Sequence, residues 1–167
     1  MPIKCGGAPQ KIMYLSEETW RKNGVRDDCD IHFYTSTPGM FPVPKYGAAL
    51  KVIAENKGIT PHFTHLIQSV DGNNRTAVFK NTTTDEILET DFDLLHIVPP
   101  QTTHKFLRES PLASANGMVA VDKFTLQHLK YPNVFSLGDC ADLPAAKTAA
   151  GVFAQAPVVT NNLLKLH

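Results

Sequence analysis

The chain has 167 residues, of which 43% are hydrophobic, and it carries 16 basic and 16 acidic residues, so its formal net charge is zero. This composition is enough for a hydrophobic core and excludes a disordered chain, while the balanced charge gives no reason to expect a nucleic-acid partner. No apolar run reaches the roughly 20 residues that span a bilayer, and the sequence has neither a Cys-x-x-Cys pair nor a Cys/His cluster, so we expect no metal site.

The N-terminal segment places a cysteine just ahead of a predicted helix. Cys5 is followed by two glycines, and the sequence then predicts a helix from about Pro9 to Lys22 that ends before Gly24. The start of a helix, together with the nearby Lys4 and Lys11, provides the positive potential that suits a reactive thiolate. The alternative is a free, buried cysteine, which is the commoner state of an isolated Cys.

The middle of the chain is typical of a helix between two strands, followed by further short strands. The predicted helix is Lys45–Lys57, and the predicted strands are Ile31–Thr35, Ile59–Phe63, Leu66–Val70, Thr76–Phe79, Glu86–Glu89 and Phe92–Val98. Apolar side chains recur in the helix at i, i+3, i+4 and i+7, and we assign them to its buried face: Tyr46, Ala49, Leu50 and Ile53. The sequence Asp-Gly-Asn-Asn at 71–74 predicts a hairpin turn.

The C-terminal third contains the sequence Tyr-Pro-Asn-Val-Phe-Ser-Leu-Gly-Asp-Cys at 131–140, which predicts a strand and then a turn. Val134, Phe135 and Leu137 form the short apolar run of a buried parallel strand. Gly138 permits a tight turn, and Asp139 presents a carboxylate where the strand ends. A helix follows from about Ala145 to Leu164. Ligands bind at this position in open α/β sheets, although a Gly-Asp pair also occurs as a simple turn after a strand.

Two of these segments resemble one enzyme family. The 131–140 sequence resembles the second FAD-binding signature of the two-dinucleotide-domain flavoprotein disulfide reductases, and Lys-Cys-Gly-Gly-Ala-Pro-Gln-Lys-Ile-Met-Tyr-Leu at 4–15 resembles their mitochondrial-type sulfide:quinone oxidoreductase branch. The resemblance implies that Asp139 hydrogen-bonds the ribityl chain of FAD and that Lys147 lies near the flavin, at the start of the terminal helix. It further implies that Cys5 carries a persulfide, and that Thr148 and Gln155 pack near the isoalloxazine.

The resemblance also implies an α/β, Rossmann-like FAD/NAD(P)-binding fold with a three-stranded antiparallel meander and incomplete domains. Residues 1–100 would be an NAD-like domain that lacks its first strand, and residues 101–167 the C-terminal part of the FAD-binding domain. No Gly-x-Gly-x-x-Gly fingerprint for the FAD pyrophosphate occurs in the sequence. We therefore expect the chain to be the central part of a longer enzyme and to be inactive in isolation.

The implied activity is oxidation of hydrogen sulfide, with transfer of sulfur to a thiol or sulfite acceptor and of electrons through FAD to ubiquinone. The implied location is the mitochondrial inner membrane, with peripheral association through parts outside this chain. Two alternatives stay open: another FAD-dependent enzyme of the NADH:quinone reductase type, and a truncated module without catalysis. Neighbouring side chains alternate along extended backbone, so we expect Cys140 to point away from the cofactor, into the packing of sheet against helix.

Overall fold

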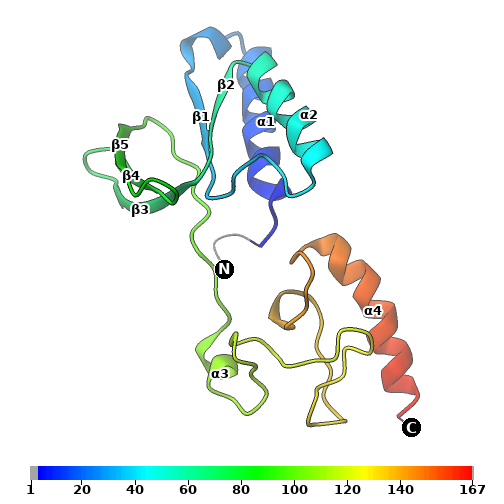
Figure 1. Cartoon of the computed structure of the whole chain (residues 1–167). Helices are drawn as coiled ribbons and strands as arrows, with labels where there is room; N and C mark the ends of the chain where they lie inside the picture. Colours follow the sequence, from blue (N-terminus) through cyan, green and yellow to red (C-terminus); the bar gives the residue numbers. More distant parts are fainter. Residues whose placement is uncertain (1–3, 167) are drawn as a thin grey trace. The chain divides into compact units, whose positions relative to one another are not determined.

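The computed structural model describes residues 4–166, which form two compact units, Gly6–Pro99 and residues 4–5 with 100–166. In chain order the elements, drawn in Figure 1, are α1 (Gly7–Lys22), η1 (Arg26–Asp28), β1 (Ile31–Tyr34), α2 (Pro44–Asn56), β2 (Ile59–His62), β3 (His65–Asp71), β4 (Thr76–Asn81), β5 (Ile87–Asp91), α3 (Lys105–Arg108), η2 (Gly138–Cys140) and α4 (Ala149–Leu164). The prediction of a missing first strand rests partly on residues 1–3, which lie outside the described residues.

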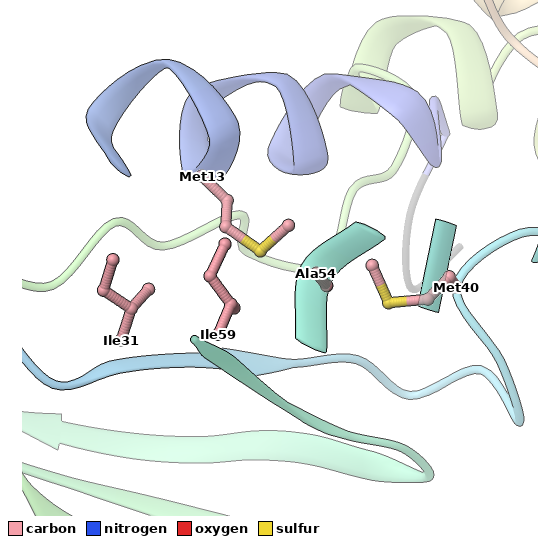
Figure 2. Close-up of a cluster of buried hydrophobic side chains, with 5 residues drawn as sticks. All are labelled: Met13, Ile31, Met40, Ala54 and Ile59. Atoms are coloured by element: carbon pink, nitrogen blue, oxygen red, sulfur yellow. The ribbon is translucent and has the colours of Figure 1, made fainter. Parts of the chain in front are cut away.

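The core of the first unit lies between two helices and a parallel pair of strands. β1 pairs with β2 in parallel, with Ile31 opposite Ile59, and α2 makes the crossover that a parallel pair requires. Figure 2 shows the buried side chains that fill this core, which come from α1, β1, the 36–43 loop, α2 and β2: Met13, Ile31, Met40, Ala54 and Ile59. The predicted strand–helix–strand order is therefore confirmed.

The buried face of α2 differs from the predicted face. Tyr46 and Ile53 are exposed, whereas Gly47 and Ala54 are buried and Leu50 is half-buried. A Cβ added at Gly47 would lie only 2.9 Å from the carbonyl oxygen of Phe41. The preceding loop thus packs directly onto this face of the helix, and that close approach selects small residues over the larger apolar ones that the spacing favoured.

A three-stranded antiparallel sheet with the order β3-β4-β5 completes the first unit, as predicted. The hairpin turn is held by Asp71 Oδ1, which accepts the backbone N–H of Asn73 at 2.9 Å and of Asn74 at 3.1 Å. These hydrogen bonds, led by the one from Asn74, hold the pKa of Asp71 below its ordinary value. The ring of Tyr34 stacks on that of Phe79 with centroids 4.1 Å apart, so β1 contacts β4 directly.

The predicted strand Phe92–Val98 is not formed. Leu94 is 73% exposed and Ile97 is also exposed, and the segment is irregular up to the two prolines that follow. Apolar content alone predicted this strand, but a strand also needs a neighbour to accept and donate its backbone hydrogen bonds. Among the described residues, only Phe92 finds such a partner, its N–H donating to the carbonyl oxygen of Arg75 at 2.9 Å, and the pairing does not continue beyond it.

The second unit consists of loops joined by isolated bridges, with α4 as its one long helix among the described residues. The predicted strand at Val134–Leu137 is reduced to a single bridge between Phe135 and Gln127, because only one side of the segment finds a backbone partner. The unit has a small core made by Val119, Val121 and Ala141, with Leu107, Leu112 and Leu143 packed around them. Helix α4 starts four residues later than predicted, where Thr148 Oγ1 accepts the N–H of Gly151 at 3.1 Å.

Candidate functional site

The turn at Gly138 projects the carboxylate of Asp139 outward. Leu137 is extended, and Gly138 has a φ of +70°, a conformation that glycine adopts without steric cost. The Gly138 N–H donates to Gln155 Oε1 on α4 at 2.7 Å, and a Cβ at this position would lie 3.0 Å from Val152 Cγ2. The turn is thus packed against α4, while the Asp139 side chain beyond it is 49% exposed and able to accept hydrogen bonds from a ligand.

An ion pair brings the N-terminal segment to this carboxylate. Lys4 Nζ donates to Asp139 Oδ2, across 135 positions of sequence. Cys5 is the next residue, is partly buried and has a free thiol. The two main candidate residues, Cys5 and Asp139, therefore belong to the same compact unit.

Lys147 lies in the loop ahead of α4 and not in the first turn of the helix. It precedes the N-cap Thr148 and is only 6% exposed. Its ammonium group donates to the carbonyl oxygen of Ala141, with the carbonyl oxygen of Leu143 at 3.5 Å. A buried charge is tolerated only with such partners, so in this structure Lys147 braces the loop between Asp139 and α4.

Thr148 and Gln155 both accept hydrogen bonds from backbone N–H groups. Thr148 caps α4, and Gln155 holds the N–H of Gly138. The capping role had a sequence signal, since threonine is a favoured N-cap residue. The contacts of Gln155 with Gly138 and of Lys4 with Asp139 had none, because each joins positions that no local pattern connects.

Cys140 does not point into the packing as predicted. It is exposed, and its Sγ lies 3.2 Å from Ser136 Oγ. The prediction assumed extended backbone, but residues Gly138–Cys140 form the 3-10 helix η2, in which alternation between two faces does not apply. Cys140 is one of three free cysteines, together with Cys5 and Cys29.

The sequence has no Cys/His cluster, but the first unit brings several histidines together. His32 Nδ1 lies 2.9 Å from His62 Nε2, and His32 Nε2 lies 3.0 Å from a carboxylate oxygen of Asp30. Burial, and then the neighbouring His32 and His65, hold the pKa of His62 below its ordinary value. Within residues 4–166 no group of three or more His, Cys, Asp or Glu side chains is arranged to hold a metal ion.

A cavity of about 310 Å³ lies beside α4 in the second unit. Its lining is mostly apolar and comprises Lys123, Phe124, Leu126, Leu143, Pro144, Ala145, Ala154, Gln155 and Val158. Neither Cys5 nor Asp139 lines it, so we do not assign it to the same site. Among the described helices, none combines the length and the apolar content needed to cross a membrane.

Comparisons with known proteins find relatives that share one name. The chain is 44% identical over 163 residues to a mitochondrial sulfide:quinone oxidoreductase of Dictyostelium discoideum, and 45% identical over 163 residues to one of Schizosaccharomyces pombe. These alignments cover 97% and 96% of the chain but 36% of each relative, so the chain spans about a third of their length. No family model matches the chain.

The solved structures confirm the predicted α/β, Rossmann-like fold class. The crystal structure of the sulfide:quinone oxidoreductase from Aquifex aeolicus superposes with a TM-score of 0.73 at 18% identity, covering 86% of this chain and 34% of that one. At this level of identity the similarity concerns the fold alone. The sequence relatives, at much higher identity, carry the assignment of family.

Proposed function

We propose that this chain, which belongs to the sulfide:quinone oxidoreductase family, supplies a redox cysteine and a flavin-contacting segment to a sulfide-oxidising flavoenzyme. The observation that carries the proposal is the ion pair of Lys4 with Asp139, which joins the residue before Cys5 to the FAD-like sequence 131–140 within one unit. Because the chain spans 36% of its relatives, the remaining parts of the active site would come from sequence outside it.

The residues around Asp139 suit a flavin. An outward carboxylate with two oxygens can accept hydroxyl hydrogens of a ribityl chain, and Gly138 lets the backbone make the tight turn behind it. We therefore propose that Asp139 binds FAD and that Lys147 contributes by holding the loop that follows. The unit of residues 100–166 would be part of the FAD-binding domain, and the unit Gly6–Pro99 part of the NAD-like domain.

Cys5 would act as a thiol in disulfide exchange. Hydrogen sulfide attacks a disulfide between Cys5 and a cysteine outside this chain, the S–S bond breaks, and one cysteine keeps the added sulfur as a persulfide while the other leaves as a thiol. The outer sulfur passes to a thiol or sulfite acceptor. Two thiols remain, and their return to a disulfide releases two electrons and two protons. The bound flavin would supply the acceptor for these electrons, on their way to ubiquinone.

The relatives named above are mitochondrial, and we propose the same location for this protein. Ubiquinone is membrane-soluble, so the enzyme would associate peripherally with the inner membrane. That contact would involve parts outside this chain.

The test is quinone reduction by a full-length protein that contains this chain. Sulfide should drive the reduction, and Cys5→Ala should lower it to background while FAD stays bound, because the only group removed is the thiol. Lys22→Gln, which changes an exposed cation in the last turn of α1, serves as the control and should keep wild-type activity. If NADH and not sulfide drives the reaction, and Cys5→Ala has no effect, the protein is a reductase of the NADH:quinone type.

A further inference from the structure

We propose that Lys4 is a positioning residue that holds the Cys5 segment beside Asp139. The proposal rests on the proposed function, because it concerns how the redox cysteine is kept near the flavin-binding segment. Its starting point is the ion pair between Lys4 Nζ and Asp139 Oδ2. Cys5 is bonded directly to Lys4, so whatever fixes Lys4 also limits where the thiol can go.

The ion pair lies close to the point where the chain passes from one compact unit to the other. Residues 4 and 5 belong to the unit of residues 100–166, whereas the chain from Gly6 onward belongs to the other unit. Cys5 is thus the last residue before the polypeptide passes from one unit to the other. Among the hydrogen bonds and ion pairs of residues 4–166, the one from Lys4 to Asp139 ties this short segment to its unit.

The carboxylate of Asp139 can serve Lys4 and a cofactor at the same time. Lys4 occupies Oδ2, and a carboxylate has about four lone-pair sites on its two oxygens, so Oδ1 stays available for a hydroxyl group. The side chains of Lys4 and Asp139 are 40% and 49% exposed, and ion pairs of this exposure add little to global stability. Loss of Lys4 should therefore shift Cys5 without lowering the melting temperature.

Cys140 provides a probe on the other side of the ion pair, because it follows Asp139 directly and is exposed. In the chain carrying Cys29→Ser, the remaining thiols are those of Cys5 and Cys140. A short bismaleimide that has reacted with one of them can then react with the other and cross-link the two. Otherwise the second thiol is capped by a second reagent. The ratio of cross-linked to doubly capped product, read by intact mass, reports the effective concentration of one thiol near the other. Thiol reactivity cancels from this ratio, because both outcomes consume the same thiol by the same chemistry.

Lys4→Gln and Asp139→Asn should each lower this ratio, by at least about threefold. Lys4→Arg retains the charge and should keep the ratio, and Lys11→Gln is the matched control for loss of a nearby cation. An unchanged ratio in both Lys4→Gln and Asp139→Asn would overturn the positioning role, since the segment would then be held without the ion pair.

A second measurement separates this proposal from the function on which it rests. In a full-length protein that contains this chain, Lys4→Gln should keep its FAD but lose about threefold to fivefold in kcat for sulfide-dependent quinone reduction, and Lys4→Arg should recover most of the loss. Activity that survives Cys5→Ala overturns the proposed function. An inactive Cys5→Ala, with wild-type kcat in Lys4→Gln, overturns the positioning role alone.

Discussion

The backbone N–H of Gly138 donates a hydrogen bond to Gln155 Oε1 at 2.7 Å, and this contact joins the turn that carries Asp139 to helix α4. The same glycine has a φ of +70°, and a Cβ at this position would lie only 3.0 Å from Val152 Cγ2. Backbone conformation and close packing therefore both require glycine at this position.

Gly138→Ala should lower the free energy of unfolding by about 1–3 kcal/mol, through an unfavourable φ and a forced shift of Val152. Urea denaturation followed by circular dichroism measures this change. Gly72→Ala is the control, since a Cβ at Gly72 meets nothing within 4 Å and its φ lies outside the left-handed region. Equal stabilities for the two variants would show that the turn is not constrained as described.

Glu17 of α1 is a buried carboxylate on which cations from separate segments converge. Its side chain is 2% exposed and pairs with Arg21, with Lys57 Nζ at 2.8 Å and with Arg26 Nε at 3.8 Å. Glu17→Gln keeps the shape but removes the charge, and should cost about 1.5–3 kcal/mol of unfolding free energy. The exposed neighbour Glu18, changed to Gln, should leave the denaturation midpoint unaltered, although it too pairs with a lysine.

The same carboxylate should make stability depend on pH. Burial by itself would raise the pKa of Glu17, but hydrogen bonds from Arg21 and Lys57 outweigh it, so the pKa lies below its ordinary value. The carboxylate of Glu17 therefore binds a proton more readily in the unfolded chain than in the folded chain. Its contribution to stability is complete above the unfolded pKa of about 4.3, and it is lost as the pH falls through the lower folded pKa. Urea midpoints of wild type and Glu17→Gln should differ near neutral pH and converge in acid; a constant difference would contradict the assignment.

The sequence predicted elements whose partners are local in the chain. The β1–α2–β2 unit and the β3-β4-β5 meander followed from periodicity and turn residues. The strands expected at Phe92–Val98 and Val134–Leu137 did not form, because apolar content says nothing about whether a neighbouring strand is present. In the site, Cys5 and Asp139 were found by their motifs, whereas the contact of Lys4 with Asp139 depends on the tertiary fold and has no local signal.

Asp139→Ala, in a full-length protein that contains this chain, should weaken retention of FAD. The change removes one charge-assisted hydrogen bond, worth roughly 1.5–3 kcal/mol, which corresponds to about a tenfold to hundredfold weaker affinity. Flavin absorbance per chain after dialysis is the measurement. The matched control is Asp142→Ala, which removes a nearby carboxylate that accepts from Asn116 at 3.1 Å and 3.2 Å. Normal flavin content together with lost sulfide turnover would place Asp139 in the sulfur chemistry and not in cofactor binding.

The last prediction concerns which cysteine of this chain reacts with sulfide. Cys140 is the tempting alternative, since it is exposed beside Asp139. Its Sγ, however, lies 3.2 Å from Ser136 Oγ and 3.5 Å from the carbonyl oxygen of Leu137, which are contacts within its own turn.

Cys140→Ala would remove only these weak contacts of a thiol. It should leave sulfide-dependent quinone reduction by the full-length protein within several-fold of wild type, whereas Cys5→Ala should abolish it. Both variants are compared at equal FAD content, so that a loss of cofactor is not read as a loss of chemistry. A Cys140→Ala protein that holds FAD and is as inactive as Cys5→Ala would make Cys140 the redox partner of Cys5, and the second reactive cysteine would then lie within this chain.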